Sequence, residues 1–171
     1  MSKKPVLDIK IEANGPAVHM QGENGEVLTI PFKGSVDSEI FRGIVEPCGV
    51  DTQVVNAAHV RHMSARHMLT GKDADGNACH IYVENNGWFD DLTKSVPFHT
   101  VPTFYTDSPK LAAYLHRNQF VDEGVDEADG LHIYFYEIDH AEPVVFHWTL
   151  HLDDIDPSES VNTESLLEMY I

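Results

Sequence analysis

The sequence predicts an all-β protein: a closed antiparallel β-barrel with one or two short helices. Three observations support this fold class, namely segments in which apolar and polar residues alternate, hairpin turns between them, and few segments with helical spacing. The 171 residues are enough for one domain with its own core, and no linker or repeat divides them. We therefore predict a single barrel domain over residues 1–171, in which residues 153–171 form an acidic C-terminal tail.

The strands are predicted from alternation and from turn residues. Residues 7–12 alternate between aliphatic and charged side chains, which indicates a strand with one buried and one solvated face. The pair Asn24-Gly25 lies between strand-like residues 17–21 and 27–32 and predicts a tight hairpin. Further strands are expected at residues 39–45, 52–60, 64–70, 78–84, 131–138 and 144–152. Residues 72–77 join two of these strands as a second hairpin.

Two helices are expected. Asp107-Ser108-Pro109 supplies a capping residue and a proline at the first helical position, which predicts a helix over residues 109–117. A second short helix is expected in the tail, over residues 162–170. Residues 122–129 are strongly acidic and are predicted to form a loop or the tip of a hairpin.

Composition excludes some classes of partner. There are 11 Lys and Arg residues against 28 Asp and Glu residues, so the formal net charge is −17. A negative field repels nucleic acid and anionic membrane surfaces, and neither is expected as a partner. Cys48 and Cys79 have no metal-binding or disulfide-framework spacing and are expected to be reduced thiols. With no early apolar leader and no apolar run long enough to span a bilayer, a cytoplasmic location is expected.

Several strand faces carry histidine and tyrosine where a solvated face would ordinarily carry lysine and glutamate. His80, Tyr82 and Glu84 share one such face, and Tyr134 and Tyr136 share another. Rings with a polar tip suit a partly desolvated wall that binds a small molecule. The alternative is that these faces are an exposed surface or an interface between copies of the chain.

No cofactor or metal motif occurs in the chain. It lacks a glycine-rich nucleotide loop, the elbow of serine hydrolases, a CxxC pair and an HExxH motif. We therefore expect no cofactor and no metal. What remains is acid/base chemistry by His, Asp, Glu or Tyr side chains, with an arginine stabilising an anion.

The order of several segments resembles an uncharacterised family of small bacterial and fungal β-barrel proteins, number 3237 among the domains of unknown function. The matching segments are residues 41–51, 64–69, 75–76, 81–87, 101–106, 114–115 and 136–138. The resemblance implies a closed antiparallel barrel with Asp51 and Arg66 as pocket charges. Two departures would reshape a pocket, because relatives usually have an aromatic residue where this chain has Thr52, and tyrosine where it has His67.

The leading functional hypothesis is a cofactor-independent isomerase, lyase or hydratase that acts on a small oxygenated or carboxylate-bearing molecule. In this hypothesis Arg66 binds a carboxylate or enolate oxygen, and either His67 or Asp51 is the base. Either Tyr82 or Tyr134 is the hydrogen-bond donor. The ligand-binding candidates are His80, Tyr82, Glu84, Tyr105, Tyr134 and Tyr136. Two other hypotheses stay open: a non-catalytic ligand-binding barrel, and a structural subunit that forms a homo-oligomer through its His/Tyr faces.

Removal of metal ions is expected to leave the protein unchanged, despite its 11 histidines. Dialysis of the untagged protein against a chelator should not shift its melting temperature, and should not alter its binding of a small molecule. Stoichiometric zinc, iron or nickel in the freshly purified protein would contradict this prediction.

Overall fold

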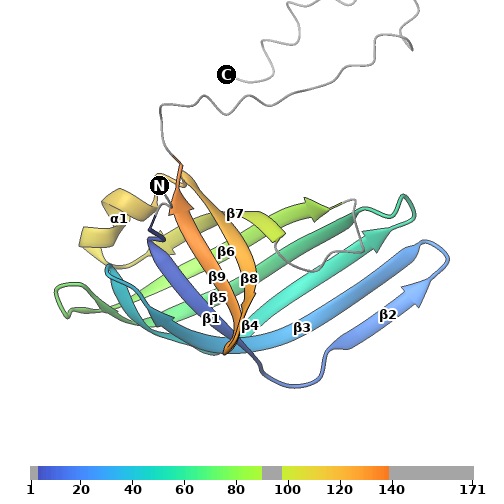
Figure 1. Ribbon diagram of the computed structural model, residues 1–171, viewed down its shortest axis with the longest axis horizontal. Helices are drawn as coiled ribbons and strands as arrows, with labels where there is room; N and C mark the ends of the chain where they lie inside the picture. The colour runs from blue at the N-terminus through green and yellow to red at the C-terminus, as the bar shows by residue number, and fades with distance from the viewer. Residues whose placement is uncertain (1–3, 90–97, 139–171) are drawn as a thin grey trace, which may run out of the picture. The chain divides into compact units, whose positions relative to one another are not determined.

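The computed structural model describes residues 4–89 and 98–138, which form nine β-strands and one α-helix (Figure 1). The elements are β1 (Leu7–Ala13), β2 (Val18–Gly22), β3 (Gly25–Asp37), β4 (Phe41–Asn56), β5 (Arg61–Asp73), β6 (Ala78–Phe89), β7 (Phe98–Thr106), α1 (Pro109–Leu115), β8 (Phe120–Glu127) and β9 (Gly130–Glu137). The chain divides into two units, and the second, residues 140–171, lies outside the described residues. The strand expected at residues 144–152, the helix at 162–170 and the tail at 153–171 lie there too.

The strands form one antiparallel sheet that closes on itself. The strand order is β1-β9-β8-β7-β6-β5-β4-β3-β2, and β1 also pairs with β3. The second half of β3 takes this closing pair, from Phe32 to Val36, while its first half pairs with β2. Eight strands therefore make a closed barrel, as the sequence predicts, and β2 is an additional edge strand.

One half of the barrel is filled and the other half is hollow. The filled half contains Phe41, Phe104, Phe120 and Phe135, all fully buried, and the ring of Phe104 contacts those of Phe120 and Phe135 edge-on at 5.3 and 5.5 Å. α1 packs against this core through Leu111 and Leu115. The long strands β3 to β6 continue past the closing pair of β1 and β3 and extend together at that end of the barrel (Figure 1).

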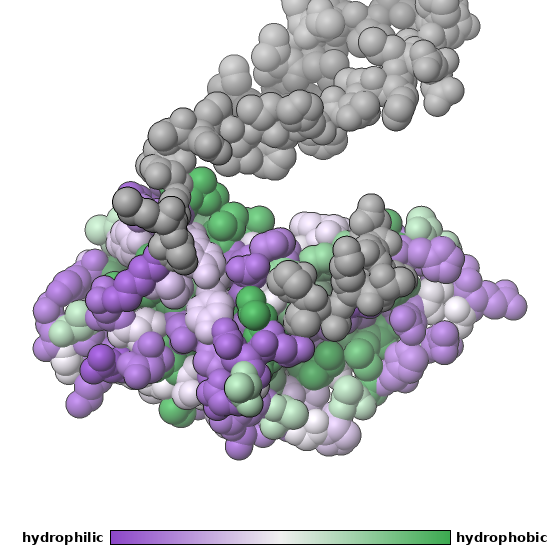
Figure 2. All heavy atoms as spheres, viewed as in Figure 1, coloured by the Kyte–Doolittle hydropathy of each residue, from purple (hydrophilic) through white to green (hydrophobic). Residues whose placement is uncertain are grey.

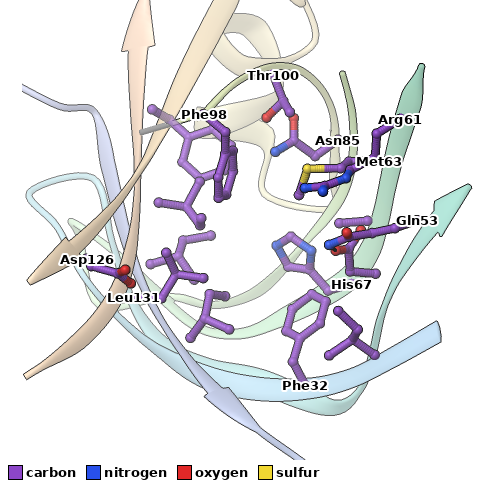
Figure 3. A pocket seen from close by; sticks show the side chains of 17 residues that line it. Phe32, Gln53, Arg61, Met63, His67, Asn85, Phe98, Thr100, Asp126 and Leu131 are labelled. Atoms are coloured by element: carbon purple, nitrogen blue, oxygen red, sulfur yellow. Dashed lines mark hydrogen bonds between the residues drawn. The ribbon is translucent and has the colours of Figure 1, made fainter. Parts of the chain in front are cut away.

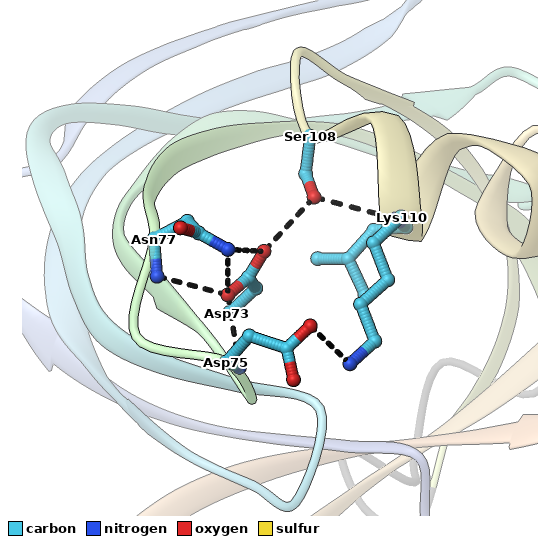
Figure 4. Close-up of polar contacts among 6 residues, drawn as sticks. Asp73, Asp75, Asn77, Ser108 and Lys110 are labelled. Carbon is cyan, nitrogen blue, oxygen red and sulfur yellow. Dashed lines mark hydrogen bonds and ion pairs between the residues drawn. The ribbon is translucent and has the colours of Figure 1, made fainter.

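A polar network ties the β5–β6 hairpin to the start of α1 (Figure 4). Asp73 Oδ1 accepts hydrogen bonds from the backbone N–H groups of Asp75 and Asn77, both at 3.0 Å. The Ser108 hydroxyl donates to Asp73 Oδ2 at 3.3 Å and accepts from the N–H of Leu111 as the N-cap of α1. The expected hairpin and the expected cap are therefore parts of one contact.

The predicted elements agree with the structure in most places. The hairpin predicted around Asn24-Gly25 is confirmed, but its turn residues are Glu23 and Asn24, because Gly25 already pairs with Gly22. Gly25 has φ of +127°, a conformation that favours glycine. The two strands predicted over residues 39–60 are one strand, β4, whose pairing with β5 is irregular between Val45 and Val50. β4 ends at Asn56, and α1 ends at Leu115, two residues earlier than predicted.

Two predictions about the second half of the chain are wrong or incomplete. The acidic residues 122–129 are predicted as a loop or a hairpin tip, but residues 122–127 belong to β8, which pairs with β9 along its length, and only residues 128–129 form the tip of that hairpin. The alternation was hidden because the inward positions of β8 carry Asp122 and Gly124 instead of aliphatic residues. β7 was not among the expected strands, since Pro102 interrupts a run that otherwise has the composition of a strand.

Hydrophilic side chains spread over much of the visible outer face, with apolar side chains between them (Figure 2). This distribution fits an acidic chain whose net charge is −17. No helix within residues 4–89 and 98–138 has the length and hydropathy that crossing a membrane requires.

Gly124 makes room for a ring that borders the hollow half, which gives a prediction about stability. A Cβ atom on Gly124 would lie 2.1–2.5 Å from ring atoms of Phe98. Gly124→Ala should therefore lower the free energy of unfolding by about 1–3 kcal/mol, the usual cost of overpacking. The control is Gly22→Ala, where a Cβ atom would meet nothing within 4 Å and the change should stay within about 0.5 kcal/mol. Equal urea-unfolding curves for the two variants would contradict this account.

Candidate functional site

The hollow half of the barrel contains a cavity of about 350 Å³. This volume lies at the lower end of the range for small-molecule sites. Its lining residues among the described part of the chain are Ile9, Ile11, Ile30, Phe32, Asp51, Gln53, Arg61, Met63, Ala65, His67, Asn85, Phe98, Thr100, Asp126, Leu131, Ile133 and Phe135. The cavity therefore has a predominantly apolar lining with a small number of polar groups.

Most of the labelled polar side chains gather on one side of the cavity, although Asp126 lies beside Leu131 and Met63 lies among the polar group (Figure 3). Gln53, Arg61, His67 and Asn85 come from the neighbouring strands β4, β5 and β6 and point into the cavity from one side. Phe98 and Leu131 lie on the opposite side, together with aliphatic residues of β1 and β9. Period-2 alternation explains the polar side, because successive inward positions of one strand lie two residues apart.

His67 is the most deeply buried titratable side chain of the lining. It is 6% exposed, and neither ring nitrogen has a hydrogen-bond partner. Its only aromatic neighbour among the described residues is Phe32, whose ring meets the imidazole edge-on at a centroid distance of 5.3 Å. Burial lowers the pKa of His67 to about 4, so the ring is neutral at physiological pH.

Asp51 lies on the adjacent strand and is half-buried. Its Oδ2 accepts a hydrogen bond from Gln53 Nε2 at 2.8 Å, while its Oδ1 is buried without a partner. Burial raises the pKa of Asp51, and the Gln53 hydrogen bond and the positive charge of Arg61 act against this rise. The carboxylate is therefore more basic than an exposed aspartate, and it has one oxygen free.

Asn85, Thr100 and Asp122 form a third polar group, at the boundary between the hollow and filled halves. Asp122 is 1% exposed and accepts a hydrogen bond from the hydroxyl of Thr100. Burial raises the pKa of Asp122 to about 6, against the effect of hydrogen bonds from Thr100 and Asn85. Asn85 lines the cavity, and its Oδ1 has no partner.

The expectation that Arg66 is a pocket charge is wrong. Arg66 lies between Ala65 and His67, which both face the cavity, so its own side chain points outward. The guanidinium is 57% exposed and donates to Glu84 Oε1 at 2.9 Å. An exposed pair of this kind contributes little to stability and is screened by salt.

The His/Tyr faces also lie outside the barrel, so the interpretation that they line a pocket is wrong. On β6, the inward positions are Cys79, Ile81 and Val83, and His80, Tyr82 and Glu84 alternate with them on the outer face. His80 pairs with Asp107 at 2.7 Å, and the Tyr82 hydroxyl donates to Glu84 at 3.4 Å. When the sheet closes, the apolar face of each alternating strand turns to the inside, because this arrangement removes the most nonpolar surface from water.

The remaining predicted binding residues also lie on the outer face of the barrel. Tyr134 and Tyr136 alternate with the inward residues Ile133 and Phe135 of β9, and the Tyr134 hydroxyl donates to Glu127 at 3.2 Å. Tyr105 is 64% exposed and contacts the ring of His116. Of the nine predicted site residues, the structure therefore brings only Asp51 and His67 together in the cavity.

The sequence analysis did not identify Gln53, Arg61 and Asn85, which are polar residues at inward positions of β4, β5 and β6. Asn85 is the next inward residue after Val83, so extending the apolar face of β6 by one step would have found it. Gln53 and Arg61 could have been found in the same way on β4 and β5. Asp122 left no such signal, because after Phe120 the inward positions of β8 are Asp122 and Gly124, and neither marks a buried face in the sequence.

The family model described as "Protein of unknown function (DUF3237)" matches residues 1–138. This chain belongs to that family. A UPF0311 protein of Clostridium acetobutylicum is 33% identical over 126 residues, which are 64% of this chain and 77% of the relative. A crystal structure of a protein of unknown function from the same organism has a TM-score of 0.64 at 30% identity, over 81% of this chain and 97% of that one. A conserved protein of unknown function from Rhodopseudomonas palustris has a TM-score of 0.62 at 25% identity, over 80% and 96% of the two chains.

Metal ligands do not cluster in the part of the chain that the structure describes. Within residues 4–89 and 98–138, no group of three or more His, Cys, Asp and Glu side chains is placed to hold a metal ion. The expectation of no metal remains a prediction for the chelator experiment above, and the expectation of no cofactor also remains a prediction.

The depressed pKa of His67 predicts a specific loss of stability in acid. The folded protein favours the neutral ring of His67. The stability that goes with this preference is therefore fully present above 6.5, the pKa of histidine in the unfolded chain, and it is lost as the pH falls from 6.5 towards about 4, the pKa of His67 in the folded protein. In that window, the stability difference between the parent and His67→Gln should change by about 1.4 kcal/mol per pH unit. Urea unfolding at a series of pH values measures it, and a flat difference curve would contradict the burial of a neutral His67.

Proposed function

We propose that this protein is a cofactor-independent enzyme that moves a proton on a small oxygenated organic molecule held in the barrel cavity. One observation supports the proposal above all. Two titratable side chains, Asp51 and His67, line the same cavity, and each has buried polar atoms without a hydrogen-bond partner. Leaving such atoms unsatisfied costs about 1–3 kcal/mol each, so a ligand that binds them regains that free energy.

Burial assigns different roles to the two groups. It disfavours the charged form of each, so it weakens the imidazole of His67 as a base and strengthens the carboxylate of Asp51. We therefore assign Asp51 as the general base, with Oδ1 as the atom that takes the proton. A neutral His67 is the hydrogen-bond donor to the substrate oxygen, as an imidazole kept uncharged by its surroundings is able to be.

The simplest reaction for this pair is the isomerisation of a carbonyl compound. Asp51 Oδ1 removes a proton from the carbon next to the carbonyl, and the C–H electron pair forms a C=C bond while the carbonyl π pair moves to oxygen. The N–H of His67 donates to the resulting enolate oxygen. When the substrate is a β,γ-unsaturated carbonyl compound, the enolate is conjugated with the neighbouring C=C bond. The protonated Asp51 then returns the proton to the γ carbon and the double bond moves next to the carbonyl, so no electrons leave the substrate and no co-reactant is needed.

The other properties of the chain agree with a small-molecule partner in a reducing compartment. The charge of −17 disfavours nucleic acid and anionic lipid as partners. Cys48 and Cys79 are both free thiols, which is typical of cytoplasmic proteins. We therefore propose a cytoplasmic location.

A second candidate function uses the same cavity without chemistry. The apolar lining and the unpartnered Asn85 Oδ1 also suit a ligand-binding barrel. The two functions differ in one requirement: an enzyme needs Asp51 to exchange protons with the bound molecule, and a binding protein does not.

Deuterium uptake into an aromatic ketone tests the proposal without knowledge of the natural substrate. β-Tetralone fits an apolar cavity and has acidic protons next to its carbonyl. In D₂O, the parent protein should accelerate exchange of these protons, as measured by NMR. Asp51→Asn should lower the rate by about 10²-fold or more, which is the usual contribution of a general base.

The matched control is Glu84→Gln, which removes a carboxylate from the outer face of β6 and should leave the rate unchanged. His67→Gln should lower the rate by about 10²-fold, as the loss of one donor to an enolate oxygen does. Exchange that is no faster than in buffer, or that Asp51→Asn does not affect, would sink the enzyme hypothesis and favour the binding protein.

A further inference from the structure

We infer that the cavity binds a neutral hydroxylated aromatic compound of the diphenol class, whose hydroxyl groups donate to Asp51 Oδ1 and Asn85 Oδ1. This inference rests on the proposed use of the cavity as the substrate site and narrows the oxygenated molecule to one class. A phenol is the enol tautomer of a ketone, so Asp51 Oδ1 accepts a hydrogen bond from the hydroxyl form and removes the C–H proton of the keto form. It comes from the kind of hydrogen-bonding atom that the cavity leaves unsatisfied, from the spacing of these atoms, and from the charge of the lining.

The unsatisfied atoms beside His67 are acceptors. Asp51 uses Oδ2 for Gln53 and leaves Oδ1 free. The side chain of Asn85 lies close enough to Asp122 to influence the pKa of that carboxyl, and Asn85 Oδ1 is buried without a hydrogen-bond partner. A ligand that satisfies both oxygens must bring hydrogen-bond donors, and hydroxyl groups supply them.

The strand register puts these acceptors on either side of a small residue. Ala65 of β5 is the direct partner of Asp51 on β4 and of Asn85 on β6. Two strand spacings of about 4.8 Å therefore separate the backbones of Asp51 and Asn85, and their side chains extend inward from there. Because Ala65 has only a methyl group, a flat ring has room above it, with substituents that reach both oxygens.

The apolar part of the lining suits the ring itself. Phe98 lines the cavity together with aliphatic residues of β1 and β9, and Phe32 lines it beside His67. Aromatic side chains bind a flat apolar ring through stacked and edge-to-face contacts. His67 lies beside Phe32 and has one donor and one acceptor for a further oxygen of the ligand.

The charge of the lining disfavours an anionic ligand. Asp51 and Asp126 contribute two carboxylates, against the single guanidinium of Arg61 among the described lining residues. The charge of Arg61 already acts on Asp51. A ligand carboxylate would therefore meet a net negative wall in a protein that is itself strongly acidic, whereas a neutral hydroxyl would not.

Calorimetric titration of three sets of probes on the full-length protein tests the inference. The sets are dihydroxynaphthalene isomers, dimethylnaphthalenes of the same shape, and naphthoates. The best diol should bind at least about tenfold more tightly than the matching dimethyl compound and than any naphthoate, because each of its two hydroxyl groups adds a hydrogen bond to a buried acceptor. Asn85→Leu should weaken the diol about tenfold and leave the dimethyl compound unchanged, whereas the control Asn86→Leu, on the outer face of the same strand, should change neither.

The comparison among probes uses the parent protein, so it holds even if a variant fails to fold. A naphthoate or dimethyl compound that binds as tightly as the diols overturns the inference, and so does the absence of binding by every diol up to its solubility limit. Failure of the enzyme proposal is distinguishable, because a diol preference without Asp51-dependent deuterium exchange identifies a diphenol-binding protein. Asp51-dependent exchange without a diol preference keeps the enzyme and removes the substrate class.

Discussion

The pairing of β1 with the second half of β3 closes the sheet, and the arrangement of the site depends on this closure. In an open sheet, both faces of β5 or β6 could meet solvent or a partner. Once the sheet is closed, one side of every strand faces a confined interior and the other faces water. Asp51, His67 and Asn85 become neighbours of one cavity for this reason, although they lie on three strands.

Desolvation then determines the chemistry of that interior. It lowers the pKa of His67 and raises the pKa values of Asp51 and Asp122. The same desolvation makes the imidazole neutral and the carboxylates more basic. The imidazole is then able to donate a hydrogen bond and the carboxylate of Asp51 to accept a proton, instead of the two groups forming an ion pair. The filled half of the barrel supports this arrangement, because its aromatic core and α1 occupy one end of the interior and the described cavity lies in the other half.

The outer faces show how a residue pattern can suggest a site that the fold does not make. His80, Tyr82 and Tyr134 find partners in Asp107, Glu84 and Glu127, so each polar tip is satisfied at the surface. These rings cover the outside of strands whose other face is aliphatic. Their part in a homo-oligomer stays a prediction, since a surface of satisfied polar rings suits both solvent and a second copy of the chain.

The sequence by itself determined the fold class, the two hairpins and the helix after Ser108, because alternation, Asn-Gly turns and capping residues act locally. It also identified Asp51 and His67, which are polar residues on strands that match the family. Only the tertiary structure decided that Arg66 and the His/Tyr faces point outward while Asn85 and Asp122 point inward. Alternation defines two faces of a strand without saying which is inside, and that choice is made by the summed burial of all strands in the closed barrel.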